Sequence, residues 1–501
     1  MRVRLSLPLL ATALVAAGCS GLGKAPEPAL VDLPPTPASW TGLDRSTATV
    51  EPRDRWWREF EAAALDELVR RVLENNHDLM AAAAQVDAAA AQARIAGAAL
   101  TPQVAASFDP SRRRQNFIGL PIPGSGGVLS STSTTIGANL NVSWEVDLWG
   151  RLRAGRNAAA SELGAAAADL EGARLSLAGQ ASKVWFAAVE ARQQLELARE
   201  TLDNQQRTED QIRRRFERGL RSALDLRLAI SSRSSAEAAV AGRERQLDAT
   251  LRQAAILAGD YPSAQQQLAD DDLPALVTSP PAGLPSELVG RRPDLQAAEL
   301  RFEAAGFTVA ETRAALLPRL SLTGSAGRVS EDLEDLLDSD FSVWSLAGNL
   351  LQPIFQGGRL RAGVDLATAR QRGAAEGYAQ AVLRAFAEVE TALAAEERLR
   401  SRAQALASAA DAAEAAREIA QDRYTAGLVD YLSVLETQRL AFNVRSQMLE
   451  ARRQLLDNRV DLHLALGGGS ELGSAGQEVT AATIEPAAGL TSLVGEAGSE
   501  R

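Results

Sequence analysis

The chain has 501 residues, a formal net charge of −11 at pH 7 and one cysteine. The acidic balance argues against a nucleic-acid binder, because such a protein carries a basic surface, and a single cysteine excludes a disulfide framework within the chain. Aromatic residues make up only 4% of the sequence, which is low for an enzyme with several compact cores. Alanine instead dominates the apolar positions and favours closely packed helices.

The N-terminus has the pattern of a cleaved lipoprotein signal, predicted at residues 1–18. It begins with Arg2 and Arg4, continues as an apolar run and ends in small residues before Cys19. The resemblance to bacterial lipoprotein signals implies a covalent lipid on Cys19, and no other cofactor is expected. Ser20 is compatible with sorting to the outer membrane. Residues 19–55 would then form an extended, proline-rich, lipid-anchored segment.

Two helices are expected after Trp56 and Trp57. The first has four apolar residues on one face at helical spacing, namely Leu65, Leu68, Val69 and Val72. Asn75 and Asn76 interrupt this pattern. The second helix should run from about residue 78 to residue 100 and end before Pro102.

The apolar period then changes to two. Between residues 135 and 148 apolar side chains such as Leu140, Val142 and Trp144 alternate with polar or small ones, as in a strand with one apolar face. We predict strands at about 103–117 and 132–149. Strands of this length could cross a membrane, which takes about 9–11 residues, or could belong to a soluble sandwich, and the alternation alone leaves both possibilities open.

Long helices are predicted where proline is missing for more than a hundred residues. No proline lies between Pro123 and Pro262 or between Pro353 and Pro486, and both stretches are rich in strong helix formers. We predict helical hairpins at 150–258 and 358–466, whose longer arms would each extend about 100 Å. Helices of this length need neighbours alongside them, as in a coiled coil or a helical tube.

Each hairpin has a defined turn at its tip. Gly219 and Gly427 are suited to the left-handed conformation that ends a helix, and Ser222 and Asp430 are favoured residues for capping the returning helix. The predicted tips comprise Arg218, Gly219, Leu220, Ala426, Gly427 and Leu428.

The chain is duplicated internally. The sequence from Gly150 to Gly155 recurs in similar form from Gly358 to Gly363, and Gly219-Leu220 recurs as Gly427-Leu428, both 208 residues later. We predict a first repeat at 56–258, a connector at 259–292, and a second repeat at 293–466 with strands at about 319–330 and 340–356. Residues 467–501 would form a disordered tail.

Four strands per chain predict an oligomer if the sheet lies in lipid. An open sheet edge is not tolerated there, and a closed membrane barrel needs about eight strands or more. Two copies would supply eight strands and three would supply twelve, and the periodicity does not choose between them.

The whole mature chain resembles the outer-membrane factor (TolC-like) family, lipoprotein efflux branch. The matching segments are Trp56-Trp57, Asn75 to Leu79, Ser143 to Gly150, Arg291 to Leu295, Gln352 to Phe355 and Arg423 to Arg439. The resemblance implies an α+β membrane protein. In that fold a homotrimer forms one twelve-stranded β-barrel, with four strands per chain, continued by a long α-helical periplasmic barrel with an equatorial belt.

The resemblance also implies a function. The chain would be a cell outer-membrane channel that reaches into the periplasm and serves as the exit duct of a tripartite efflux system. It would receive small molecules from a periplasmic adaptor and an inner-membrane pump of RND type, and would contact outer-membrane lipid but no nucleic acid. The alternatives are the duct of a type I protein secretion system and a non-pore periplasmic structural lipoprotein.

The candidate site lies at the second tip. Leu432, Glu436 and Arg439 share one helix face, and the resemblance implies that they form the pore constriction, with Glu436 one methylene longer than the aspartate often found there. Three copies of Glu436 would favour cations. The alternative is a solvated ion pair beside a core leucine.

The two tips are not equivalent at these positions, because the first hairpin has Leu224, Leu228 and Ser231 there. The exposed turns of both tips would dock the adaptor. No catalytic or metal centre is expected: His77 and His463, the only histidines, are expected in cap or surface positions.

Overall fold

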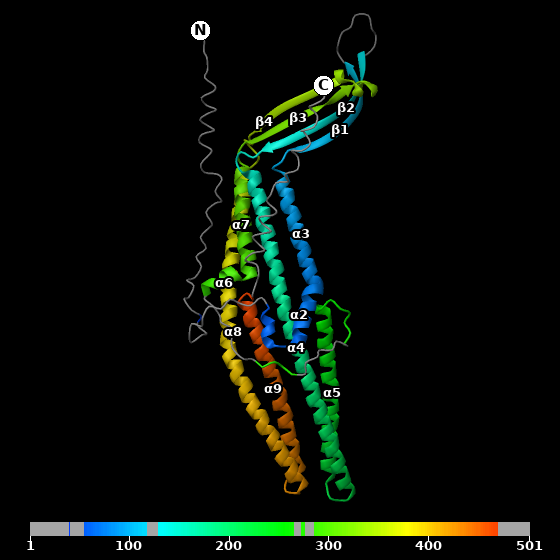
Figure 1. The fold of residues 1–501 in the computed structure, drawn as a ribbon, viewed down its shortest axis with the longest axis vertical. Helices are drawn as coiled ribbons and strands as arrows, with labels where there is room; N and C mark the ends of the chain where they lie inside the picture. The colour runs from blue at the N-terminus through cyan, green and yellow to red at the C-terminus, as the bar shows by residue number, and fades with distance from the viewer. Residues whose placement is uncertain (1–39, 41–54, 118–128, 265–271, 276–284, 469–501) are drawn as a thin grey trace, which may run out of the picture. The chain divides into compact units, whose positions relative to one another are not determined.

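The computed structural model describes residue 40 and residues 55–117, 129–264, 272–275 and 285–468. The predicted signal peptide at 1–18, Cys19, nearly all of the anchored segment and the tail after residue 468 lie outside these residues. The described chain contains long helices and one antiparallel sheet (Figure 1). No helix in this part is both long and apolar enough to span a membrane.

The chain forms two compact units. Among the described residues, one contains Asp87–Leu163 and Glu299–Gly377, and the other contains those from Trp40 to Val86, Gly164–Ala298 and those from Tyr378 onward. The first unit holds the whole sheet, and the second holds both hairpin tips.

The sheet has the order β1-β2-β3-β4, with antiparallel neighbours throughout. The strands are β1 (Gln103–Phe117), β2 (Leu129–Val146), β3 (Arg319–Ser330) and β4 (Ser342–Leu351). β2 begins three residues before the expected start because its serine- and threonine-rich end still pairs with β1 through the backbone. β4 is shorter than the expected 340–356, because two short 3-10 helices precede it and Pro353 follows, which cannot donate a ladder hydrogen bond.

One face of the sheet is largely apolar and the other is largely polar. Cross-strand neighbours on the first face form rows, such as Ala106, Leu140, Ala326 and Trp344. The adjacent row on the opposite face is Ala105, Asn141, Ser325 and Ser345. The apolar face is not buried within the chain, since Leu140 is 50%, Trp144 36% and Trp344 81% exposed.

The helices repeat in matched pairs. α3 (His77–Ala98) and α7 (Pro293–Ala314) each have 22 residues. α4 (Arg151–Glu217) and α8 (Arg359–Thr425) each have 67, and α5 (Ala223–Leu257) and α9 (Tyr431–Ala465) each have 35. The equal lengths confirm the internal duplication. The smaller elements are η1 (Trp56–Phe60), α2 (Ala63–Asn75), α6 (Pro285–Arg291), η2 (Glu334–Leu337) and η3 (Ser339–Phe341).

A short helix meets the returning helix end to end in each half. Asn76, just before α3, donates from Nδ2 to the Leu257 carbonyl at the end of α5 (2.9 Å). Arg292, just before α7, donates from Nη1 to the Ala465 carbonyl at the end of α9 (3.1 Å). These seams satisfy carbonyls that a helix end leaves without a partner, and they place equivalent residues of the two repeats in equivalent positions.

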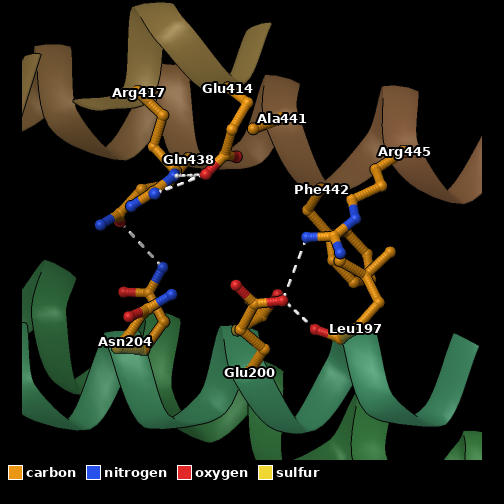
Figure 2. A pocket seen from close by; sticks show the side chains of 11 residues that line it. Leu197, Glu200, Asn204, Glu414, Arg417, Gln438, Ala441, Phe442 and Arg445 are labelled. Atoms are coloured by element: carbon orange, nitrogen blue, oxygen red, sulfur yellow. Dashed lines mark hydrogen bonds and ion pairs between the residues drawn. The ribbon is translucent and has the colours of Figure 1, made fainter. Parts of the chain in front are cut away.

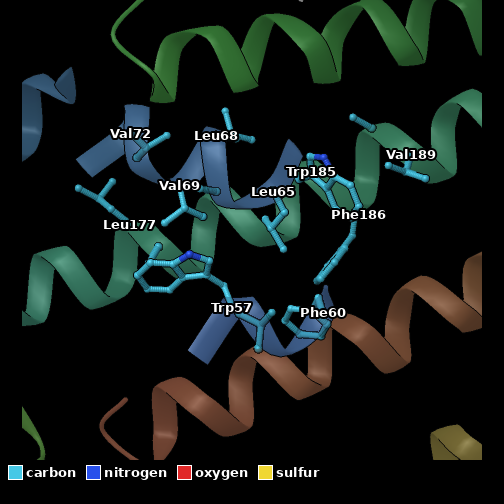
Figure 3. Close-up of a cluster of buried hydrophobic side chains, with 14 of the residues drawn as sticks. Trp57, Phe60, Leu65, Leu68, Val69, Val72, Leu177, Trp185, Phe186 and Val189 are labelled. Carbon is cyan, nitrogen blue, oxygen red and sulfur yellow. The ribbon is translucent and has the colours of Figure 1, made fainter. Parts of the chain in front are cut away.

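The main core of the second unit forms where η1 and α2 pack on α4 (Figure 3). The predicted apolar face of α2 is buried, with Leu65 fully inaccessible. The Phe60 ring meets Phe186 of α4 edge to face, with centroids 5.0 Å apart. Burying each such side chain stabilises the fold by about 1.5–3 kcal/mol, so this cluster fixes the N-terminal elements against the long helix.

A buried charge cluster joins η1 to α8 and α9. Arg459 is 1% exposed and pairs with Glu396 of α8 and, at 3.5 Å, with Glu59 of η1. Burial opposes ionisation of Glu59, but the neighbouring His463 and Arg459 outweigh it and hold its pKa below the usual value. The expectation of a cap or surface position for His463 is wrong, because this side chain is buried and stacked on Trp56, with centroids 4.9 Å apart. His77, by contrast, is exposed at the start of α3.

Candidate functional site

Both hairpin turns have the same backbone hydrogen bonds. At the first, the Leu220 amide donates to the Arg215 carbonyl and the Gly219 amide donates to the Phe216 carbonyl, both at 2.8 Å. At the second, Leu428 donates to the Arg423 carbonyl (2.8 Å), and Gly427 makes the equivalent inner bond. This is the pattern of a helix terminated by a left-handed glycine, and φ is +77° at Gly219 and +74° at Gly427.

The predicted caps start the returning helices. The Ser222 side chain accepts from the Asp225 amide (3.2 Å), and Asp225 completes a capping box with the Ser222 amide. Asp430 accepts from the Ser433 amide at 2.9 Å. Hydrogen bonds with Ser433 lower the pKa of Asp430, so this cap is ionised at neutral pH and complements the N-terminal end of the helix dipole.

An aromatic cluster connects the two tips. Tyr424 of α8 and Tyr431 of α9 are both buried, with ring centroids 6.0 Å apart. Two arginines of the first hairpin lie near the Tyr424 ring, with Arg215 Cζ 5.4 Å and Arg221 Cζ 4.6 Å from its centroid. A guanidinium at this distance is attracted to the ring, so a contact between residues about 200 positions apart holds the second hairpin against the first. Burial raises the pKa of the Tyr431 hydroxyl.

The predicted constriction residues lie on the solvent side of α9. Leu432 is 53% exposed, and Glu436 pairs with Arg439 at 3.5 Å, with about two-thirds of each side chain exposed. Leu432 is therefore no core leucine in the single chain, and the apolar contacts of this helix are made by Val434 and Leu435. The residues thus form a polar and apolar surface that nothing in the described chain covers.

The predicted docking residues are exposed as well. Arg218, Gly219 and Ala426 lie on the surface of the turns, and Leu220 and Leu428 are 68% and 74% exposed. Two equivalent leucines therefore project from equivalent turns. Single exposed apolar side chains are normal on a protein surface, so it is the matched position of the two leucines in the two repeats that makes them docking candidates.

A polar layer separates the hairpins above the tips (Figure 2). Arg445 of α9 reaches Glu200 of α4 at 3.1 Å, while Arg417 binds Glu414 on its own helix at 2.5 Å and lowers the pKa of that carboxyl group. Figure 2 shows these side chains lining one groove between α4, α8 and α9. Polar partners of this kind can be exchanged for water at small cost, because exposed ion pairs contribute about 0–1 kcal/mol.

Sequence reasoning missed the residues that join the hairpins. Neither Tyr424 nor Arg215 is among the site residues that the sequence predicts. Nor is the buried pair in which Gln205 of α4 donates to Gln438 of α9 at 3.0 Å. These contacts join residues that are far apart in the sequence, so no local pattern predicts them. An aromatic residue just before the turn glycine, facing an arginine-rich turn in the other repeat, was the one available signal.

Comparison with known proteins now identifies the relatives of this chain. The model of the outer membrane efflux protein family matches residues 68–260 and 284–468, one match in each repeat. The pyoverdine export outer membrane protein OpmQ of Pseudomonas putida is 35% identical over 473 residues, covering 92% of this chain and 97% of that protein. The outer membrane protein OprJ of Pseudomonas aeruginosa is 33% identical, covering 88% and 91% of the two chains.

A solved structure agrees with this relationship. The open state of the MtrE outer membrane channel of Neisseria gonorrhoeae has a TM-score of 0.74 and 29% identity, covering 89% of this chain and 97% of that one. The resemblance to outer-membrane efflux channels is confirmed, and it favours a duct over a non-pore structural lipoprotein. With the family model matched in both repeats, the chain belongs to the outer membrane efflux protein family.

Proposed function

We propose that this protein is the exit duct of a tripartite efflux system, carrying small molecules from a periplasmic adaptor and an RND-type inner-membrane pump to the exterior. Three copies would close their sheets into a twelve-stranded barrel, and the helical hairpins would continue the duct into the periplasm. Two curated relatives support this proposal, since one bears the name of a pyoverdine exporter and another that of a toluene efflux pump.

The observation that carries the proposal is the two-faced, open-edged sheet. On β2 the apolar face runs from Ile136 to Val146, about 34 Å at ~3.4 Å per residue. With a strand tilt of about 40° the band would be roughly 26 Å tall, close to the ~25 Å apolar band of outer-membrane barrels. β1 and β4 have no outer neighbour in the sheet, and lipid does not tolerate open edges. Pairing with further copies would close these edges and leave the apolar face in contact with lipid.

The second tip supplies the gate of the proposed duct. With three copies around an axis, Leu432, Glu436 and Arg439 would line the narrow end, where Glu436 from each copy forms a negative ring that favours cations. The relative crystallised in an open state supports a channel that opens. Opening would slide the second hairpin along the polar layer, since the groove between α4 and α9 offers exchangeable partners, and contact with partner proteins would drive it.

The exposed turns would receive the adaptor. Leu220 and Leu428 would fit apolar pockets on the partner, and Arg218 would add charge complementarity. At the other end, a lipid on Cys19 would add a second attachment to the outer membrane, because a barrel and an acyl anchor together bind more firmly than one chain of lipid.

Single-channel recording in planar bilayers tests the duct and its gate. The Glu436→Ala/Arg439→Ala variant should conduct several-fold more than the wild type, because the charged ring is removed while the buried face of α9 stays intact. The matched control is Glu67→Ala/Arg70→Ala, which removes an equally exposed i,i+3 pair on α2 and should leave conductance unchanged. Equal conductance in wild type and tip variant would remove the gate assignment, and no channel activity at all would remove the duct.

The docking role has its own test. Arg218→Glu should abolish efflux in cells while the trimer yield stays normal, and a photo-crosslinker at Ala426 should capture the adaptor. An unaffected efflux rate in Arg218→Glu cells, together with no adaptor captured at Ala426, would place the docking surface elsewhere.

A further inference from the structure

The sheet has two unpaired edges, one with a run of arginines and the other next to an acidic loop. β1 and β4 are the outer strands of the order β1-β2-β3-β4. Each presents a row of backbone donors and acceptors to whatever lies beside it. The charged residues lie at the ends of these strands that are remote from the helices, where β1 leads toward β2 and β3 leads toward β4.

The β1 edge carries three consecutive arginines. Arg112, Arg113 and Arg114, here called the rim arginines, are exposed and pair with threonine and serine residues of β2. Arg114 donates to the Ser130 hydroxyl at 3.1 Å. No carboxylate of the described chain forms an ion pair with any of the three, so their charge is unmatched within one copy.

The β4 edge is preceded by an acidic loop, residues 331–341. It contains six carboxylates: Glu331, Asp332, Glu334, Asp335, Asp338 and Asp340. The loop is folded, because Arg328 of β3 donates to the Leu336 carbonyl (2.8 Å) and Asp338 accepts from the Asp340 amide (3.1 Å). Within the described residues none of the six makes a salt bridge, and all but the half-buried Asp335 are exposed, so their negative charge is unmatched within one copy.

Strand register places the two charged segments at the same end of the sheet. Gln103 lies opposite Ser143, Ser143 opposite Thr323, and Thr323 opposite Ala347. Counting five residues back from Ala347 reaches Ser342, where β4 begins, and counting five along β1 from Gln103 reaches Phe108. If a neighbouring copy pairs instead with the helix-side ends flush, Gln103 faces Leu351 and Arg112 faces Ser342. In both registers the rim arginines reach to or beyond the first residue of β4, next to the acidic loop that precedes it.

We propose that the rim arginines of one copy clasp the acidic loop of the next copy, so that charge pairing fixes which strand edges meet and in which register. The proposal rests on the closure of the sheet by several copies proposed above. Antiparallel pairing with β4 extends the sheet, since β1 and β4 run in opposite directions. Arginine suits this role because its planar fork binds a carboxylate through two hydrogen bonds, and a one-residue slip would turn the apolar face inward.

A second copy fits this surface better than an anionic lipid headgroup. Lipid phosphates would meet the rim arginines favourably, but at the same end of the sheet they would meet six carboxylates from the acidic loop. Like charges placed together are unfavourable, whereas complementary patches steer partners and reject wrong ones. Only a partner with both edges matches both charges, and this chain is such a partner.

Crosslinking in the full-length protein tests the clasp. The Arg113→Cys/Asp338→Cys variant, treated in outer membranes with a bismaleimide of about 10 Å, which spans roughly three residues of strand, should give a ladder up to covalent trimer. The wild type, which retains Cys19, is the reagent control. Ala105→Cys/Ser345→Cys places thiols at equal height on the same two edges, nearer the helices, and reports closure of the sheet alone.

The two pairs separate failure of the clasp from failure of the proposed duct. A ladder from the lower pair without one from the rim pair would overturn the clasp and leave the closed sheet standing. No ladder from either pair would overturn both.

Charge exchange gives an independent outcome. Arg112→Glu/Arg113→Glu/Arg114→Glu should lose most of the heat-resistant trimer, and adding Asp335→Arg/Asp338→Arg/Asp340→Arg in the same chain should restore it. A loss that the second set does not rescue, but that varies with the phosphate content of the surrounding lipid A, would assign the arginines to lipid and overturn the clasp.

Discussion

Replacing Asp457 by asparagine should stabilise the protein at neutral pH. The Asp457 side chain lies on α9 and is only 20% exposed. Burial raises its pKa to about 6, against the attraction of Arg453 and of Lys183 from α4, while Asp461 and Glu190 add to the rise. The buried surroundings therefore destabilise the ionised form of this carboxyl group.

The sign of the effect follows from proton binding. In the unfolded chain the pKa is 3.8, so between that value and about pH 6 the folded protein keeps a proton that the unfolded chain has lost. The free energy of unfolding then falls as pH rises through this window, and the full cost is present above it. A difference of about 2 pKa units corresponds to ~3 kcal/mol per chain. Asparagine keeps an oxygen that can accept a hydrogen bond from Arg453, but this bond is weaker because the acceptor is no longer charged. We therefore expect the free energy of unfolding above pH 6 to rise by about 1–2 kcal/mol.

Thermal unfolding of the purified protein in detergent, followed by far-UV circular dichroism from pH 4.5 to pH 8, measures this. The Asp457→Asn midpoint should exceed that of the wild type at pH 8, and the gap should shrink toward pH 4.5 as the wild-type carboxylate takes up its proton. The exposed Asp411 on α8 provides a control substitution, Asp411→Asn, whose small effect should not vary with pH. A midpoint at or below wild type at pH 8, or a gap independent of pH, would refute the reasoning.

Three further substitutions should act through the backbone or a buried charge. Gly427→Ala should lower the thermal midpoint by the equivalent of about 1 kcal/mol, because φ is +74° there, whereas Gly377→Ala, in open space within α8, should raise it slightly. Gly327→Ala should abolish insertion measured as outer-membrane yield, since its Cβ would lie 2.2 Å from a carbonyl oxygen of β2, while Gly348→Ala has room and should insert normally. Arg292→Lys should lower the free energy of unfolding by about 2–3 kcal/mol, measured by thermal unfolding. One ammonium group cannot replace the guanidinium that binds Asp294, Glu388 and the Ala465 carbonyl at the end of α9.

Local patterns predicted the elements well and their contacts poorly. The alternation of apolar side chains located β3 and the first half of β1, because these segments have one apolar face. The same rule missed the first residues of β2, where Ser130 and Ser131 pair with β1 but add no apolar side chain to the alternation. Glycine and capping residues located both turns as well, because each ends or starts a helix through contacts with residues only a few positions away.

Contacts between distant residues had no such signal. His463 occupies the last turn of its helix, a position that is usually exposed, yet Trp56 of η1 covers it from about 400 residues away in sequence. Tyr424 meets Arg215 and Arg221 only because the two repeats pack together at their tips. Both arrangements depend on tertiary packing, which the sequence pattern of a single helix does not encode.

The end-to-end seams have a mechanical consequence. A continuous helix carries load through every turn of its hydrogen-bond ladder, whereas at a seam the backbone ladder is interrupted and side chains must bridge it. The first seam is bridged by the neutral amide of Asn76 and, beside it, by the ion pair of Arg71 with Asp260. The second is bridged by Arg292, whose guanidinium also binds Asp294 and Glu388. Each returning column is therefore jointed, and a bending force on it would be absorbed first at the seam, where a few side-chain contacts replace the backbone ladder.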